Sequence, residues 1–254
     1  MDKIIIAIGG GEMGGPKFDN HKNIIGYHEI ETTKIDQEIV KLANKEKPNL
    51  LFIPTAAGDS LGYCSSIEKQ YGQHFGCSVS NLFLLNDNFD HEKAKSQICS
   101  ADIIYVGGGN TKFMLDIWAK RGIISLLKEA YERGTILSGL SAGANCWFDC
   151  FSSDSFLSDA DKQDFNIAKE KLAILNGLGY LKGAFCPHYL FEAYRRPAFL
   201  YQIQRLNISA YGVDNNAALV FVNEKLNKVI KSQPLAKAFK IICENGKIIE
   251  KEIL

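Results

Sequence analysis

Short apolar runs alternate with segments of helical spacing over the first half of the chain. Several of the runs are apolar throughout, which is typical of strands that are buried on both faces of a sheet. The predicted strands are Ile4 to Ile8, Leu50 to Ile53, Val79 to Leu85, Ile103 to Val106 and Thr135 to Ser138. The predicted helices are Lys34 to Lys45, Gly62 to Phe75, His91 to Ile98 and Thr111 to Tyr131, the last broken near Arg121-Gly122. The alternation predicts an α/β fold in which helices cover both faces of a mostly parallel sheet and ligands bind at the carboxyl ends of its strands.

Beyond about Ser209 the pattern changes, and strand follows strand. The segment Glu244-Asn245-Gly246-Lys247 has the composition of a hairpin turn. We therefore predict an antiparallel extension at one edge of the sheet, which could serve a homodimer. No repeat, low-complexity tract or linker interrupts residues 1–254, so we expect a single domain. The strands of the extension are predicted at Ala210 to Val213, Ala217 to Val222, Lys228 to Lys231, Phe239 to Cys243 and Lys247 to Ile253.

Composition and charge favour a small-molecule partner. The chain has 254 residues, of which 46% are hydrophobic, enough to bury a full core. Its 29 basic residues balance 29 acidic ones without long runs of either sign, which argues against a nucleic-acid groove or a polybasic membrane patch. No apolar stretch approaches the roughly 20 residues of a membrane span, and the start lacks a signal-peptide core, so we expect a cytoplasmic protein. Seven cysteines without a C-x-x-C pair indicate reduced thiols, and we expect no metal.

A serine between two glycines follows the fifth predicted strand. The sequence Gly139-Leu140-Ser141-Ala142-Gly143 has the form G-x-S-x-G and precedes a helix-compatible segment. A serine at the apex of such a strand–turn–helix has an exposed hydroxyl, and the N–H groups of the following helix face the position where an oxyanion would develop. The pattern predicts a nucleophile elbow, although an ordinary strand-to-helix turn has the same composition.

Two glycine triplets also follow predicted strands. Gly107-Gly108-Gly109 runs directly into Asn110-Thr111 and a helical pattern, so its N–H groups can supply an oxyanion donor or simply form a tight turn. It lacks the Gly-Lys-Ser/Thr sequence of a phosphate-binding loop. Gly9-Gly10-Gly11 resembles a dinucleotide fingerprint only loosely, because Gly14-Gly15-Pro16 interrupts the helix that should follow. We expect it to pass beneath the active site, and we expect no cofactor.

A serine nucleophile needs a base, and the chain has five histidines. Only His188 follows an apolar run, Ala184-Phe185-Cys186-Pro187, at a predicted strand end. Strand ends are where α/β enzymes place catalytic groups, so His188 is the candidate base. The others, in polar loops or helical patterns, are His21, His28, His74 and His91.

Four ordered segments together resemble the peptidase E (aspartyl dipeptidase) and cyanophycinase family of serine peptidases, over Ile4 to about Val222. The resemblance implies one peptidase E-like domain, a flavodoxin-like three-layer sandwich similar to class I glutamine amidotransferases. It also implies a cytoplasmic enzyme that cleaves short peptides without a cofactor. The segments are Phe52-Ile53-Pro54-Thr55-Ala56, Tyr105-Val106-Gly107-Gly108-Gly109-Asn110-Thr111, Gly139-Leu140-Ser141-Ala142-Gly143-Ala144-Asn145 and Cys186-Pro187-His188-Tyr189.

The same resemblance assigns roles to individual residues. Ser141 would be the nucleophile and His188 the general base. The amides of Gly109 and Ala142 would form the oxyanion hole, and Asn110 would touch the substrate.

The group that orients His188 is open at this stage. One candidate is Asp154, near the position where the family carries an aspartate with an assigned role. The other is the segment Gly212-Val213-Asp214-Asn215-Asn216, in which Asn215 aligns with a glutamate of peptidase E but carries no charge. Because a serine nucleophile gains more from a charged partner than a cysteine does, we favour Asp154, with Asn215 or Asp214 as alternatives.

Substrate choice depends on charges near His188. Arg195 and Arg196 could bind a substrate carboxylate, as an arginine of this region does in peptidase E for an amino-terminal aspartate. The spacing departs from that pattern, so both could equally be surface charges. The aromatic residues that could line the pocket or pack in the core are Trp147, Phe148, Tyr189, Phe191 and Tyr194.

Other function classes share parts of the pattern. A non-hydrolytic ligand-binding or amidotransferase-like module would use the same sheet, but an amidotransferase needs a cysteine where Ser141 stands, and Cys146 falls on the following helix. An α/β-hydrolase requires its acid on a later strand between serine and histidine. Asp154 follows Ser141 by only thirteen residues, which leaves little room for an intervening helix and strand, and Asp214 falls after His188. The sequence therefore predicts a serine peptidase acting on short peptides, with the non-hydrolytic module as the alternative.

Overall fold

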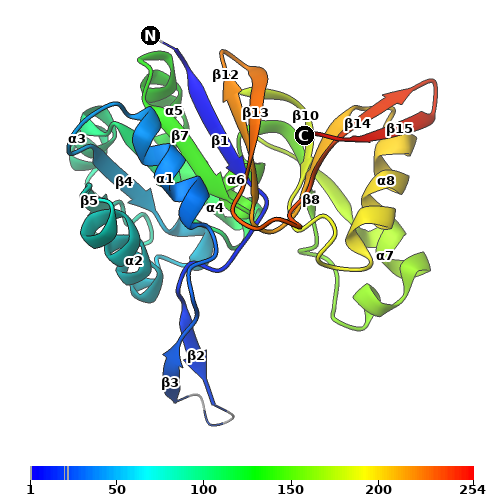
Figure 1. Ribbon diagram of the computed structural model, residues 1–254, viewed down its shortest axis with the longest axis horizontal. Helices are drawn as coiled ribbons and strands as arrows, with labels where there is room; N and C mark the ends of the chain where they lie inside the picture. Colours follow the sequence, from blue (N-terminus) through cyan, green and yellow to red (C-terminus); the bar gives the residue numbers. More distant parts are fainter. Residues whose placement is uncertain (1, 20, 22) are drawn as a thin grey trace.

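The computed structural model describes residues 2–19, 21 and 23–254 and contains two large sheets side by side, with helices around them (Figure 1). The first sheet has the order β13-β12-β1-β7-β6-β4-β5. The five strands β1, β7, β6, β4 and β5 are parallel to one another. At one edge β12 pairs antiparallel with β1, and β13 pairs antiparallel with β12. The strand bounds are β1 (Ile4–Ile8), β4 (Asn49–Ile53), β5 (Ser78–Asn81), β6 (Ile103–Val106), β7 (Ile136–Leu140), β12 (Ala217–Val222) and β13 (Lys225–Lys231).

Helices cover both faces of this sheet. Alternate residues of β1 enter different cores: Ile5 packs with the α3, α4 and α5 side, and Ile6 packs with the α1 and α2 side. This arrangement confirms the predicted α/β sheet, and the predicted break between two helices is confirmed at Gly122, which has a left-handed φ of 68°. The bounds are α1 (Thr33–Leu42), η1 (Thr55–Ala57), α2 (Leu61–Ile67), the π-helical segment η2 (Glu68–His74), α3 (His91–Ser100), α4 (Thr111–Lys120) and α5 (Ile123–Glu132).

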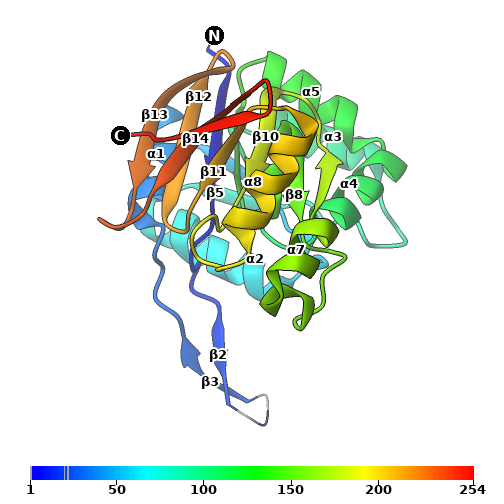
Figure 2. The same cartoon turned by 90° about the vertical axis from the view of Figure 1, so that its right-hand side faces the viewer.

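The second sheet has the order β15-β14-β11-β10-β8-β9 and packs against α7 and α8 (Figure 2). Its presence corrects the prediction of one antiparallel extension on a single sheet. The carboxyl-terminal strands divide between the sheets, because β11 pairs in parallel with β10 whereas the next strand, β12, returns to β1. The bounds are α6 (Ala142–Asn145), β8 (Phe148–Ser153), η3 (Asp161–Gln163), α7 (Phe165–Lys171), β9 (Ala173–Asn176), β10 (Leu181–Cys186), α8 (Arg195–Leu206), β11 (Ala210–Val213), β14 (Ala238–Glu244) and β15 (Lys247–Glu252).

Two hairpins complete the fold. The predicted hairpin turn joins β14 to β15, and Asn245 and Gly246 both have positive φ, as its tight turn requires. A second ribbon, β2 (Pro16–Phe18) and β3 (Ile24–Tyr27), projects from the body in a region where the sequence suggested only a polar loop (Figure 1). Within the described part of the chain, no helix is long and apolar enough to cross a membrane.

The parallel strands bring the candidate loops together. Residues Ile8 of β1 and Leu140 of β7 are paired, as are Val106 of β6 and Gly139 of β7, so these strands end at one edge of the sheet. The turn between β11 and β12 crosses from the second sheet to the first at the same edge. Segments that are far apart in the sequence thereby meet around Ser141.

Candidate active site

Ser141 occupies a sharp turn between β7 and α6. Its backbone has φ 53° and ψ −108°, a strained conformation for a residue other than glycine. A Cβ at Gly139 would overlap the carbonyl of Gly143, and one at Gly143 would overlap the carbonyl of Val106. Both glycines are therefore required by close backbone contacts, and the segment has the geometry of the predicted elbow.

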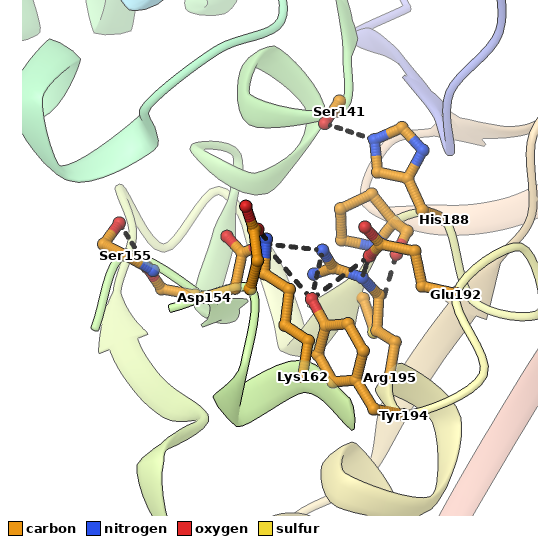
Figure 3. Close-up of polar contacts among 12 residues, drawn as sticks. Ser141, Asp154, Ser155, Lys162, His188, Glu192, Tyr194 and Arg195 are labelled. Carbon is orange, nitrogen blue, oxygen red and sulfur yellow. Dashed lines mark hydrogen bonds and ion pairs between the residues drawn. The ribbon is translucent and has the colours of Figure 1, made fainter. Parts of the chain in front are cut away.

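His188 lies at the end of β10 and faces the serine. Its Nε2 is 2.8 Å from Ser141 Oγ, and its Nδ1 is 2.6 Å from Asn215 Oδ1 (Figure 3 shows the first contact). The backbone N–H of His188 donates to the carbonyl of Gly9. A Cβ at Gly10 would overlap both the imidazole and the side-chain amide of Asn215. The first glycine triplet is thus the backbone floor beneath this pair, as the sequence suggested.

Asn215 fixes the role of each imidazole nitrogen. Its amide oxygen can only accept, so Nδ1 carries the proton and Nε2 presents its lone pair to the Ser141 hydroxyl. This is the tautomer in which an imidazole can take a proton from the serine. A neutral amide can therefore orient the histidine, although it adds no negative charge.

Asp154, which the sequence favoured as the orienting acid, lies elsewhere. Its carboxylate accepts from Arg195 Nη2 at 2.9 Å and from the Tyr194 hydroxyl at 3.2 Å, and Lys162 Nζ lies 3.6 Å away (Figure 3). Burial raises the pKa of Asp154, but the charges of Arg195 and Lys162 together with the hydrogen bond from Tyr194 outweigh that effect and keep the pKa below its ordinary value. The expectation that Asp154 contacts the imidazole is corrected: the loop after β8 leads toward α8, where the buried guanidinium of Arg195 attracts the carboxylate.

Asp214, the other acidic alternative, also does not contact the imidazole. One carboxylate oxygen of Asp214 accepts from the backbone N–H of Leu190 at 3.3 Å, so it holds the loop that follows His188. Among the described residues, the side-chain hydrogen-bond partners of the imidazole are Ser141 and Asn215.

The pKa of His188 is lowered from its ordinary value of 6.5. Burial is the main cause, because it disfavours the charged imidazolium. The hydrogen bond with Asn215 opposes this effect, and the positive charge of Arg195 adds to it. At neutral pH His188 is therefore uncharged, which is the state that a general base requires.

The loop after β6 lies against the elbow. A Cβ at Gly108 would be 3.6 Å from Ser141 Cβ, and one at Gly109 would overlap the carbonyl of Ala56. Gly109 has φ 138°, and the backbone N–H of Asn110 donates to the same Ala56 carbonyl at 2.8 Å. These contacts hold the second glycine triplet beside Ser141, while Ala142 begins α6 directly after it. Both candidate oxyanion donors thus flank the serine.

A cleft of about 940 Å³ surrounds the Ser141–His188–Asn215 group. Asn110 lines it, and its Oδ1 caps α4 by accepting from the Phe113 N–H, which leaves the amide nitrogen of its side chain for a ligand. Other parts of the lining come from the ribbon and its base, from the end of β8 and from the loop that follows β8. These are Glu12, Lys17, His28, Glu29, Ile30, Glu31, Ser152, Ser153, Asp154 and Ser155.

The two candidate arginines lie in different environments. Arg195 lines the cleft, is 5% exposed and bonds to both Asp154 and Glu192. Arg196 pairs with Glu250 on β15 and does not line the cleft, which corrects its assignment as a substrate-binding residue. Of the aromatic candidates, Phe191 lines the cleft, whereas Trp147, Phe148 and Tyr189 are buried in the core and Tyr194 bonds to Asp154.

Sequence reasoning missed two polar side chains of the cleft. The amide oxygen of Asn145 and the hydroxyl of Ser152 are buried and have no hydrogen-bond partner within the described chain. Asn145 is the last residue of the segment around Ser141 that carries the family resemblance, but no role was assigned to it. No sequence pattern marks Ser152 as a functional residue. In the same described residues, no group of three or more His, Cys, Asp or Glu side chains could hold a metal ion.

A serine hydrogen-bonded to a histidine at the strand ends of an α/β fold defines the class of this protein as a serine-type hydrolase. Residues 25–229 match the model of peptidase family S51, and the chain therefore belongs to this family of serine-type peptidases. The family resemblance predicted from the four sequence segments is confirmed.

Related proteins agree with this membership. The chain is 34% identical to the uncharacterized peptidase YgaJ of Bacillus subtilis over 249 residues, which are 98% of this chain and 96% of that protein. It is 33% identical to peptidase E of Shewanella amazonensis over 99 residues, 38% of this chain and 39% of that protein. The crystal structure of a peptidase from an acI-B1 Actinobacterium has the same fold, with a TM-score of 0.67 at 18% identity over 100% of this chain and 94% of that one.

Proposed function

We propose that this S51 peptidase hydrolyses short peptides by acyl transfer through Ser141, His188 and Asn215. Ser141 Oγ attacks the peptide carbonyl while His188 Nε2 takes its proton and then gives it to the leaving amine. Water hydrolyses the acyl-enzyme by the same route in reverse. The amides of Gly109 and Ala142 would stabilise the oxyanion. The observation that carries the proposal is the continuous contact from Ser141 Oγ through the imidazole to Asn215 Oδ1.

The proposed relay differs from the Ser-His-acid arrangement that the sequence favoured. Asn215 supplies orientation, and burial of His188 supplies a neutral base at physiological pH. The cost is a less stabilised imidazolium in the transition state, since an amide carries no negative charge. We therefore expect a working but slower peptidase than one with a carboxylate at position 215.

The proposed substrate class is short peptides without a requirement for aspartate. An amino-terminal aspartate, which the family resemblance implies, would have to bind Arg195 next to Asp154 and Glu192, whose charges already compensate the guanidinium. The lining carboxylates Glu12, Glu29 and Glu31 add further negative charge. The substrates tested should therefore include aspartyl dipeptides together with dipeptides that begin with other residues.

Three broader points from the sequence are also proposed here. The first sheet with its helices would correspond to the flavodoxin-like sandwich of class I glutamine amidotransferases. The whole chain would act as one domain in the cytoplasm. A homodimer through the carboxyl-terminal strands would be compatible with this function, which needs no partner molecule other than the peptide.

Covalent labelling tests the proposal directly. A fluorophosphonate is expected to modify Ser141, as located by peptide mass spectrometry, and the labelled protein is expected to lose activity on a dipeptide panel. A folded protein that stays unlabelled and cleaves no peptide would refute the proposal and favour the non-hydrolytic module.

The pH profile of kcat/KM is expected to fall on the acid side with a midpoint below 6.5. The reason is that the pKa of His188 lies below this ordinary value, and protonation removes the base that accepts the serine proton. Initial rates between pH 4 and 9 measure this decrease in kcat/KM on the acid side. Circular dichroism at each pH shows whether the protein stays folded. A midpoint clearly above 6.5 would contradict a His188 that burial keeps neutral.

Asp154→Asn is expected to change kcat by less than about tenfold, because Asp154 bonds to Arg195 and not to the imidazole. Loss of a true relay carboxylate costs about 10⁴-fold. The variant is expected to lose about 1 kcal/mol of unfolding free energy, since Arg195 keeps Glu192. Asp159→Asn, at a side chain that is 99% exposed nearby, is the matched control for both measurements. A drop of several thousandfold in kcat would restore Asp154 as the relay acid.

A further inference from the structure

A second cavity of about 440 Å³ lies beside the loops that carry the nucleophile and the oxyanion donor. Two of its lining residues, Leu140 and Gly108, directly precede Ser141 and Gly109. The cavity shares Gly11 and Glu12 with the catalytic cleft, so the two hollows adjoin each other. The other lining residues are Met13, Gly15, Pro16, Ser60, Gly62, Tyr63 and Ser66.

The wall of this cavity is suited to an apolar group. Met13, Pro16, Tyr63 and Leu140 contribute carbon surface to it. Several of the polar side chains are engaged with backbone groups: Ser66 Oγ bonds to the carbonyls of Gly14 and Gly62, Ser60 Oγ accepts from the Tyr63 N–H, and Glu12 Oε1 accepts from the N–H groups of Met13 and Gly15. An apolar side chain placed there loses contact with water without separating these pairs.

The position of the histidine indicates which part of a peptide reaches this cavity. In acyl transfer the leaving amine departs on the side of the group that protonates it, here His188 Nε2. Gly10 lies against the Cε1–Nδ1 edge of the imidazole, and the next residue, Gly11, lines the cavity. We therefore assign the cavity to the histidine side of Ser141, the side from which the leaving amine is protonated.

We propose that this cavity is a specificity site for an apolar side chain, such as that of leucine or methionine, on the residue at the carboxyl side of the scissile bond. The proposal rests on the proposed peptidase function and adds a substrate preference to it. For a dipeptide, the preferred carboxyl-terminal residue is apolar, while the amino-terminal residue lies toward Asn110, Asn145 and Asp154.

Gly62 offers a way to fill the cavity without strain. It lies in the first turn of α2, and a Cβ added to it would meet only Ser60 Oγ, at 3.8 Å. In Gly62→Leu, kcat/KM for Ala-Leu is expected to fall about tenfold or more, whereas kcat/KM for Ala-Gly changes less than about twofold. Ser65→Leu, on an exposed position of the same helix that does not line the cavity, is the matched control and is expected to leave both values unchanged.

Enlarging the cavity tests the same site in the opposite direction. Met13→Ala removes a buried side chain from the wall and is expected to shift the preference from Ala-Leu toward Ala-Phe or Ala-Trp. Thermal unfolding of each variant shows whether it is folded, and the ratio between substrates is independent of the active fraction.

The proposal is overturned if the wild-type enzyme cleaves Ala-Leu and Ala-Asn equally well, or if its apolar preference is for Leu-Ala over Ala-Leu. A Gly62→Leu enzyme that loses all substrates alike would also overturn it. These results leave the peptidase function intact. A wild-type protein that cleaves no peptide refutes the peptidase function and the cavity proposal together.

Discussion

Replacing Ser141 with alanine is expected to lower kcat for peptide hydrolysis by about 10⁴- to 10⁶-fold. Without the hydroxyl no acyl-enzyme forms, and only binding and the oxyanion donors contribute to the residual rate. Because the substitution removes one oxygen at the strained turn, the fold is expected to persist. Steady-state rates on the best dipeptide, with fluorophosphonate labelling as a second measurement, check the expectation.

Ser138→Ala is the matched control for this change. Ser138 lies on the same strand, β7, is fully buried, and has a hydroxyl without a hydrogen-bond partner in the described chain. Its replacement is expected to leave both kcat and labelling unchanged, since no bond is lost. If Ser141→Ala kept wild-type activity, another residue would have to be the nucleophile.

The first sheet and the elbow could be predicted from sequence because their signals are local. Ile4 to Ile8 and Ile103 to Val106 are apolar throughout, as strands buried on both faces must be. The two glycines around Ser141 are dictated by backbone contacts within the same turn and the neighbouring strand. His188 was found because it follows the apolar strand β10.

The second sheet and the ribbon could not be predicted in the same way. The strand β8 mixes serine and aspartate with aromatic residues, and β9 is short and half-buried, so neither has a clear period. The ribbon strand β3 exposes Ile24, Ile25 and Tyr27, which contradicts the usual relation between apolar residues and burial. Its position depends on pairing with β2 and not on a core.

The orienting partner of His188 was open for a different physical reason. Sequence argument favoured a charge, and Asp154 supplies one, but Arg195 competes for that carboxylate from the first turn of α8. Asn215 reaches the imidazole because the turn from β11 to β12 crosses between the two sheets directly beside Gly10. A crossing between sheets has no local sequence signature, so the choice between Asp154 and Asn215 required the tertiary structure.

Substitution at Asn215 is expected to have the second large effect. Asn215→Leu keeps a similar volume but removes the acceptor of Nδ1–H, so the imidazole loses its fixed tautomer and kcat is expected to fall about 10³-fold or more. Asp214→Asn is the matched control, because Asp214 contacts the Leu190 N–H, and its kcat is expected to stay near the wild-type value. Equal losses in the two variants would show that the turn as a whole, and not the Asn215 amide, supports His188.

Asn215→Asp separates orientation from charge. The carboxylate keeps the acceptor at the same position and adds a negative charge next to Nδ1, which stabilises the imidazolium. The pKa of His188 is therefore expected to rise by about one unit or more, and the acid limb of kcat/KM to move to higher pH by the same amount. Above that limb kcat is expected to increase, because the transition state contains the charged imidazole. A pH profile identical to the wild type would mean that Asn215 does not act on His188, whereas a shifted limb with faster turnover would show that this chain uses a neutral partner where a charged one gives the faster enzyme.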